Sequence, residues 1–234
     1  GSYCGTPVMA LQAAAERLPD AIFLPGLLGT KNQLAISTQL EAMGIKDTRH
    51  LMPSILFDYF TEATRRNCDP EALAVTLDRY FTHTTGSQNI SPSLSCIITQ
   101  KCSLCCKECG AFVPEIVSPK TYPVARVVED VRAYCSAFDV VHHIALQGGE
   151  PFMHRNLEEI VTGIAEIPNL IFIDVVTNGT ITPKQRALNT LSQNGVCVIV
   201  SDYGEASSQA AEVTRLCSDN VIFTDYYRYT TDSD

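Results

Sequence analysis

The sequence has no run of basic residues and no long apolar stretch. Its 26 Asp and Glu residues outnumber its 17 Lys and Arg residues, which gives a net charge of −9. Binding to a phosphate backbone needs clustered positive charge, so we expect no nucleic-acid partner. No segment approaches the roughly 18 consecutive apolar residues of a membrane span, and no signal peptide is visible. We therefore expect a cytoplasmic protein without a membrane span.

The sequence also has only one cluster of cysteines. Four of the ten cysteines lie within residues 102–109, and the other six stand singly, at Cys4, Cys68, Cys96, Cys135, Cys197 and Cys217. Isolated cysteines in a chain of ordinary size behave as small apolar residues, so we expect these six to be reduced core thiols. No auxiliary iron–sulfur centre is predicted.

Residues 1–86 are predicted to form a smaller N-terminal region of α/β and helical structure. The pattern indicates helices at 7–18, 30–43, 53–67 and 69–82, and short strands at 21–24 and 48–52. This alternation resembles part of a Rossmann-like domain, but the fingerprint G-x-G-x-x-G is missing, so no nucleotide site is predicted here. The polar stretch 84–93 is the best candidate for a linker, and a second domain is expected over 93–234.

The second domain shows a strict alternation of apolar strands and helices. Strands are predicted at 94–99, 140–147, 170–176, 196–201 and 220–224, with helices at 123–137, 156–167, 183–194 and 207–217. Such alternation predicts parallel strands with right-handed crossovers. The strands are apolar almost throughout, so both faces of the sheet should be covered. The predicted fold class is α/β, a partial (β/α) barrel of five parallel strands.

Polar residues follow several of these strands. The cysteine group follows the first strand, and the others are followed in turn by Gly148, Gly149 and Glu150, by Asn178, and by Ser201 and Asp202. Ligands gather at the carboxyl ends of parallel strands, so we expect one site at this edge. Glycines let the backbone approach a ligand closely. The segments at Asn178 and Asp202 are equally typical of ordinary turns.

The cysteine group has the spacing of an iron–sulfur site. Three closely spaced thiolates can hold three corners of a four-iron cluster and leave the fourth iron without a protein ligand. The sequence allows two such sets, C-x3-C-x2-C through Cys102, Cys106 and Cys109, or C-x2-C-x3-C with Cys105 in the middle.

Two motifs carry a resemblance to a known family. Residues 98–111 resemble the cluster loop of the radical S-adenosylmethionine (SAM) enzymes, and Gln147-Gly148-Gly149-Glu150-Pro151 resembles the glycine-glycine-glutamate SAM site of that superfamily. The resemblance covers residues 93–225, and the family spacing selects Cys102, Cys106 and Cys109 as metal ligands. Two departures are Glu108, where the family usually has an aromatic residue, and the extra Cys105.

The resemblance implies a [4Fe–4S] cluster and SAM as cofactors. In the family, SAM binds the open iron, and one electron from the reduced cluster cleaves it to methionine and a 5′-deoxyadenosyl radical, which abstracts hydrogen from a substrate. The resemblance implies that Gly148, Gly149 and Glu150 bind the SAM amino group, with Glu150 as the negative acceptor. Asn178 is a further implied cofactor contact, and Ser201 and Asp202 are expected to bind the ribose hydroxyls. An electron donor such as flavodoxin or ferredoxin is implied as a partner. A five-stranded barrel would leave a wide mouth, which favours a large substrate, such as a peptide or a carrier-linked sugar.

Two alternatives remain open at the level of sequence. The four cysteines of residues 102–109 could hold zinc in a non-enzymatic module, although adjacent cysteines reach one tetrahedral ion with difficulty. The departures at Cys105 and Glu108 also fit a degenerate member that keeps the radical SAM fold without its activity.

Overall fold

The computed structural model describes residues 2–3, 6–7, 10–17, 38–44, 89–91 and 93–229. In the N-terminal region, β1 (Ser2–Tyr3) pairs antiparallel with β2 (Thr6–Pro7), and α1 (Leu11–Arg17) follows. Residues 38–42 are helical. Both helices fall inside predicted ones, although α1 begins at Leu11 because Pro7 pairs in β2. The elements predicted at 21–24, 48–52, 53–67 and 69–82 lie outside the described residues.

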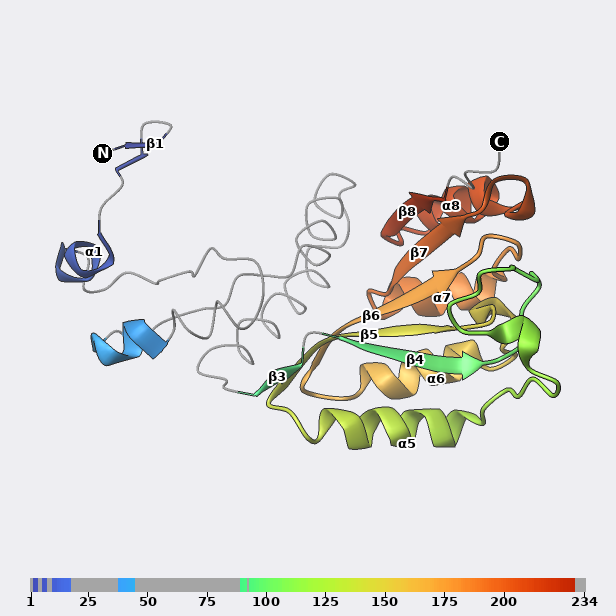
Figure 1. Ribbon diagram of the computed structural model, residues 1–234, viewed down its shortest axis with the longest axis horizontal. Helices are drawn as coiled ribbons and strands as arrows, with labels where there is room; N and C mark the ends of the chain where they lie inside the picture. Colours follow the sequence, from blue (N-terminus) through green and yellow to red (C-terminus); the bar gives the residue numbers. More distant parts are fainter. Residues whose placement is uncertain are drawn as a thin grey trace.

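One parallel sheet organises residues 89–229 (Figure 1). Its strands are β3 (Ile90–Ser91), β4 (Leu94–Thr99), β5 (Val140–Gly148), β6 (Leu170–Thr177), β7 (Cys197–Asp202) and β8 (Thr224–Arg228). Both β3 and β4 pair with β5, and β6, β7 and β8 follow in sequence order. The strands thus occupy five successive places, as expected for a partial barrel, and the predicted α/β fold class is confirmed.

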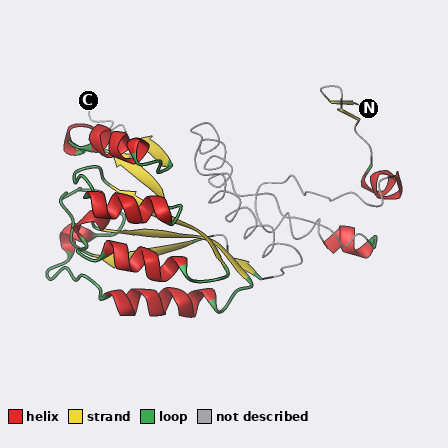
Figure 2. Ribbon diagram, turned by 180° about the vertical axis from the view of Figure 1, so that it is seen from behind, coloured by secondary structure: helices red, strands yellow, loops and turns green. Residues whose placement is uncertain are grey.

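Four helices cover one face of this sheet (Figure 2). They are α5 (Val124–Cys135), α6 (Leu157–Ala165), α7 (Gln185–Gln193) and α8 (Ala210–Asp219), each linking two consecutive strands. Leu146 and Val198 of the sheet belong to one buried cluster with Ile160, Leu188 and Val213 of these helices. Burying a side chain of this size contributes about 1.5–3 kcal/mol, so this layer provides most of the fold's stability.

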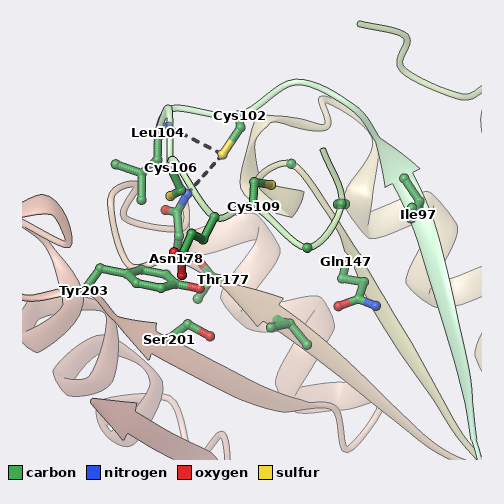
Figure 3. A pocket seen from close by; sticks show the side chains of 16 residues that line it. Ile97, Cys102, Leu104, Cys106, Cys109, Gln147, Thr177, Asn178, Ser201 and Tyr203 are labelled. Atoms are coloured by element: carbon green, nitrogen blue, oxygen red, sulfur yellow. Dashed lines mark hydrogen bonds between the residues drawn. The ribbon is translucent and has the colours of Figure 1, made fainter. Parts of the chain in front are cut away.

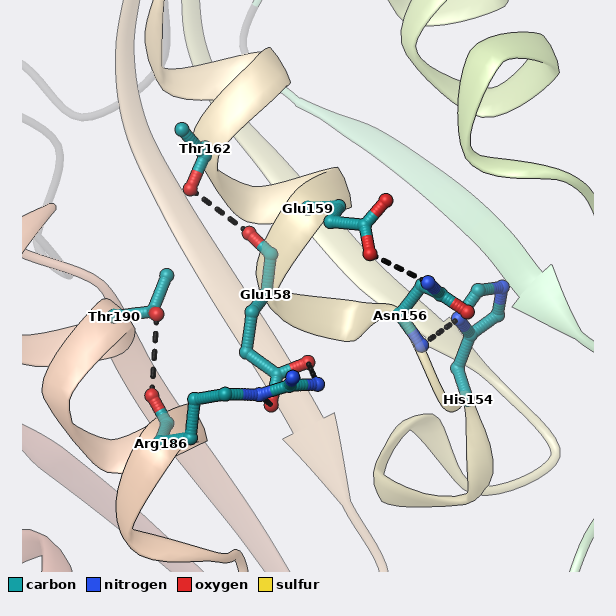
Figure 4. A network of polar contacts seen from close by, with 7 residues as sticks. All are labelled: His154, Asn156, Glu158, Glu159, Thr162, Arg186 and Thr190. Atoms are coloured by element: carbon teal, nitrogen blue, oxygen red, sulfur yellow. Dashed lines mark hydrogen bonds and ion pairs between the residues drawn. The ribbon is translucent and has the colours of Figure 1, made fainter.

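Neighbouring helices also contact each other on their outer side. The Arg186 guanidinium in α7 donates two hydrogen bonds to the Glu158 carboxylate in α6, at 2.9 and 3.2 Å (Figure 4). Burial alone would raise the pKa of Glu158, but the hydrogen bond and charge of Arg186 and the charge of Lys184 together lower it. The arginine side chain is 72% exposed, so this pair adds little stability.

In the second domain, the four predicted helices and four of the five predicted strands match the observed ones within a few residues, but the position predicted for the last strand is wrong. Sequence favoured 220–224, whereas β8 begins at Thr224. Helix α8 continues to Asp219, and Ile222 is 1% exposed in the turn that follows it. Ile222 therefore anchors this segment to the core, whereas Val221 is 49% exposed, and the apolar residues 221–223 do not form a strand.

The isolated cysteines within the described residues lie in or beside the hydrophobic core. Cys135, Cys197 and Cys217 are buried, Cys96 is half-buried, and burial raises the pKa of Cys96 and Cys135 to about 11. These four behave as the predicted core thiols, and Cys4 and Cys68 lie outside the described residues. Among the helices that the structure describes, none is long and apolar enough to cross a lipid bilayer.

Candidate active site

A long loop after β4 carries the cysteine group. The loop is closed at its base, because the Gln100 N–H donates to the Lys120 carbonyl at 2.7 Å and the Lys120 N–H donates back to the Gln100 side chain at 3.0 Å. A cavity of about 420 Å³ lies between this loop and the carboxyl ends of β5, β6 and β7. Its size falls within the roughly 300–1,000 Å³ typical of small-molecule sites.

Three of the four clustered cysteines line this cavity. They are Cys102, Cys106 and Cys109, all half-buried, whereas Cys105 is exposed and is not among the lining residues (Figure 3). Burial and the neighbouring thiols, first Cys102 and then Cys109, raise the pKa of Cys106. The set with the spacing C-x3-C-x2-C therefore faces one space, and the set that uses Cys105 does not.

Gly148 and Gly149 bring the end of β5 against the start of the cysteine loop. The Gly149 N–H donates to the Thr99 carbonyl and the Glu150 N–H to the Lys101 carbonyl, both at 2.8 Å. A Cβ atom on Gly148 would overlap the Thr99 carbonyl oxygen, and one on Gly149 would overlap that of Lys101. Both glycines also line the cavity. The absence of side chains at both glycines therefore allows the backbone at the start of the cysteine loop to pack against the end of β5.

Glu150 is not among the residues that line the cavity, and its contact with the SAM amino group stays a prediction. It is fully buried, and its carboxylate accepts hydrogen bonds from Phe152 N–H (3.0 Å), the Thr177 hydroxyl (2.9 Å) and Asn178 N–H (2.8 Å). Burial raises the pKa of Glu150, and the three donors partly offset that shift. In this structure Glu150 joins the end of β5 to the end of β6.

Asn178 lines the cavity and contacts the cysteine loop directly. Its side-chain amide donates to the Cys102 sulfur at 3.4 Å and to the Ser103 hydroxyl at 3.3 Å (Figure 3). The Cys102 sulfur also accepts from the Leu104 N–H at 3.4 Å. Asn178 is thus a link between the end of β6 and the first cysteine of the loop.

Ser201 and Asp202 point in different directions. Successive side chains of a strand face opposite sides, so only one of the two can face the cavity. Ser201 lines it and Asp202 does not. The Asp202 carboxylate accepts from the Tyr226 hydroxyl and from the Gly204 N–H at 2.8 Å, and the hydrogen bond from Tyr226 is the main cause that lowers its pKa. The contact of Asp202 with the SAM ribose stays a prediction.

Tyr203 lies one residue beyond the site residues that are predicted at the end of β7. It follows β7 and lines the cavity, and its ring stacks on Tyr229 with centroids 4.9 Å apart and an interplanar angle of 12°. Gln147 and Thr177, at the ends of β5 and β6, line the cavity as well. The signal that could have identified Tyr203 is its position two residues after Ser201, which puts both on the same side of an extended chain.

Comparison with known families agrees with this arrangement. Residues 96–211, which include the whole cysteine loop and the ends of β5, β6 and β7, match the family model of the radical SAM superfamily. The chain belongs to the radical SAM superfamily. The family predicted from the two motifs is confirmed, and the match gives no support to a zinc module.

The curated relatives of this radical SAM chain include GTP 3′,8-cyclases. The protein of Stenotrophomonas maltophilia (strain K279a) is 28% identical over 104 residues, which cover 44% of this chain and 31% of the relative. That of Pelotomaculum thermopropionicum is 31% identical over 121 residues, which cover 50% and 36%. The chain therefore spans about a third of the length of these relatives.

Solved structures with a similar fold include native anSMEcpe with bound AdoMet and Streptococcus suis SuiB bound to S-adenosylmethionine. The first matches with a TM-score of 0.48 at 19% identity and covers 58% of this chain and 43% of that chain. The second has a TM-score of 0.42 at 13% identity and covers 70% and 44%. At such identities the similarity concerns the fold alone.

Proposed function

We propose that this radical SAM chain binds a [4Fe–4S] cluster through Cys102, Cys106 and Cys109 and cleaves SAM reductively in the adjoining cavity. The observation that carries the proposal is the shared cavity, which these three thiols line together with the ends of three strands. When bound, the two cofactors supply the chemistry of the superfamily, a one-electron cleavage of SAM that starts radical reactions.

The thiols fit a cluster better than a single ion. A [4Fe–4S] cluster takes each cysteine on a different iron, so its ligands line a cavity and need not converge on one point. Among the residues that the structure describes, no three metal-binding side chains converge as ligands of one ion. None of the three thiols forms a disulfide. A bound cluster would hold all three as thiolates, which for Cys106 means overcoming a raised pKa.

The residues proposed to bind SAM are those with groups open to the cavity. The Gly148 and Gly149 backbone and the Ser201 hydroxyl provide polar contacts, and Tyr203 provides a flat aromatic wall. Stacking on Tyr229 holds that ring in place, so the opposite side of Tyr203 suits a planar group such as an adenine ring. We assign Glu150 and Asp202 a positioning role, because both carboxylates are occupied by protein donors.

The proposal concerns the shared first step of the superfamily, not GTP cyclisation in particular. The relatives named for that activity match over only about a third of their length. The sheet is open, with β8 at one edge and β3 and β4 at the other. An open barrel leaves a wide mouth, which favours a large substrate such as a peptide or a carrier-linked sugar. A one-electron donor of the flavodoxin or ferredoxin type completes the scheme.

Anaerobic reconstitution of the full chain tests the cluster. We expect about four irons and four sulfides per chain and a brown chromophore. Cys102→Ala, Cys106→Ala and Cys109→Ala should each lose the chromophore, because each removes a proposed ligand that lines the cavity.

Cys105→Ala is the matched control, since it removes a neighbouring cysteine that is exposed and does not line the cavity. It should keep most of the iron. Bleaching in Cys105→Ala with a brown Cys106→Ala protein would contradict the ligand assignment, and zinc in place of iron after anaerobic purification would contradict the proposal.

A further inference from the structure

The Asn178 amide is held in one orientation by its own contacts. Its side-chain oxygen accepts from the Thr180 N–H at 3.1 Å and from the Thr180 hydroxyl at 2.7 Å. A backbone N–H can only donate, so the oxygen must face Thr180 and the NH₂ group must face the other side. That side holds the Cys102 sulfur and the Ser103 hydroxyl. The contact to sulfur is therefore an N–H···S hydrogen bond.

The backbone of Asn178 is fixed as well. Its N–H donates to Glu150 at 2.8 Å, and its carbonyl accepts from the Ser207 hydroxyl at 2.7 Å. The residue is 8% exposed. Hydrogen bonds thus hold the side-chain oxygen, the backbone N–H and the carbonyl of Asn178. The amide donor therefore stays on Cys102 without further ordering, which makes the contact preorganised.

We propose that Asn178 is a positioning residue that tunes the redox potential of the cluster through Cys102. This inference rests on the proposed function, because it needs a cluster bound by Cys102. Hydrogen bonds to ligand sulfurs are one of the factors that set iron–sulfur potentials. Reduction adds a negative charge to the cluster, and a donor on its sulfur ligand stabilises the more negative form. The amide of Asn178 thus raises the potential and makes reduction of the cluster easier.

A redox titration of the reconstituted full chain tests this role, with the signal of the reduced cluster as the readout. In Asn178→Ala the ratio of reduced to oxidised cluster at a given potential should fall about tenfold, which is a potential lower by about 59 mV for one electron. Asn178→Leu keeps roughly the size of the side chain without the donor, and it should show the same change if the alanine variant does not fold.

Asn156→Ala is the matched control. It removes an asparagine amide that donates to Glu159 in α6 and does not line the cavity, so the amide that faces Cys102 is unchanged. Its potential should stay close to that of the wild type.

Equal potentials in wild type, Asn178→Ala and Asn178→Leu, with a full cluster in each, would overturn the inference and leave the proposed function standing. Complete loss of the cluster in both Asn178 variants would also overturn it, because the amide would then be needed for assembly and not for tuning. A wild-type chain that takes up no iron would overturn the proposed function together with this inference.

Discussion

Glu150 is a buried carboxylate whose hydrogen bonds join the ends of two neighbouring strands. Its partners are the backbone N–H groups of Phe152 and Asn178 and the hydroxyl of Thr177. The Glu150 carboxylate stabilises the fold because it provides an oxygen acceptor for each of these donors. An unpaired buried donor would destabilise the folded state by about 1–3 kcal/mol. At the scale of the residue, the acidic member of the Gly-Gly-Glu motif is therefore part of the scaffold.

Glu150→Gln should lower the free energy of unfolding by about 1.5–3 kcal/mol, because one amide NH₂ must then face a backbone N–H. Urea unfolding of the chain without cofactors measures this change. Glu129→Gln, at an exposed position of α5, is the control and should have little effect. A normal unfolding curve for Glu150→Gln combined with a large loss of SAM affinity would indicate that Glu150 contacts SAM directly.

Asp174 is a second buried carboxylate, and one of its oxygens has no hydrogen-bond partner. Burial raises its pKa from 3.8 to about 7. The raised value means that the folded chain holds the proton more tightly than the unfolded chain. The contribution of Asp174 to the free energy of unfolding is therefore most favourable below pH 3.8 and decreases as the pH rises towards 7.

Asp174→Asn removes the ionisable group. The stability of this variant relative to the wild type should therefore increase with rising pH. Its free energy of unfolding, relative to that of the wild type, should be about 2–3 kcal/mol higher at pH 8 than at pH 5. Urea unfolding of both proteins at the two pH values gives the difference. A difference that does not change with pH would show that Asp174 titrates normally in the folded chain.

Many of the residues that line the cavity could be selected from the sequence, but their orientations could not. The spacing selects Cys102, Cys106 and Cys109, and the strand ends select Asn178 and Ser201, all of which line the cavity. Glu150 and Asp202 were expected to face the ligand, whereas both are held by donors from segments distant in sequence, such as Asn178 and Tyr226. Motif spacing fixes which loop a residue occupies, and tertiary partners decide which way its side chain turns.

At the scale of elements, the cysteine loop is positioned by direct contact with the end of β5. Two backbone hydrogen bonds run from Gly149 and Glu150 to the start of the loop. The approach is too close for a side chain on Gly149, because its Cβ atom would overlap the Lys101 carbonyl. Within residues 89–229, apolar periodicity predicts the helices and strands with two exceptions. The strand β3 lies in the stretch 84–93 that is expected to be a linker, and β8 begins at Thr224, after the apolar residues 221–223 that resemble a strand.

Gly149→Ala should displace the cysteine loop and reduce iron uptake by reconstituted protein to a small fraction of the wild-type value. Gly110→Ala is the control within the same loop, since a Cβ atom at Gly110 meets nothing within 4 Å. Iron content and melting temperature measured on both variants test the idea. Equal iron uptake by the two variants would contradict a docking role for Gly149.

At the scale of the whole molecule, the division between the N-terminal region and the barrel remains a prediction from sequence. The structure adds that Asn89 is tied to the sheet, because its N–H donates to Asp139 at 2.9 Å and its side chain to the Ala137 carbonyl at 2.7 Å. The strand β3 also pairs with β5. A boundary in the polar stretch 84–93 should therefore fall before Asn89.

Limited proteolysis should cut first within residues 84–88 and release a fragment that begins near Asn89. Exposed polar segments between domains are preferred cleavage sites, and paired strands resist cleavage. Mass spectrometry of the early fragments locates the cuts. First cuts inside 140–200 would argue against two domains.

The central claim is that the cavity between the cysteine loop and the strand ends binds a cluster and SAM together. The most direct test is the release of 5′-deoxyadenosine from SAM by anaerobically reconstituted protein with dithionite as reductant. The account predicts release by the wild type and by Cys105→Ala, and none by Cys106→Ala. A wild-type protein with a full cluster that binds no SAM and releases no 5′-deoxyadenosine would contradict the account and identify a radical SAM fold without its activity.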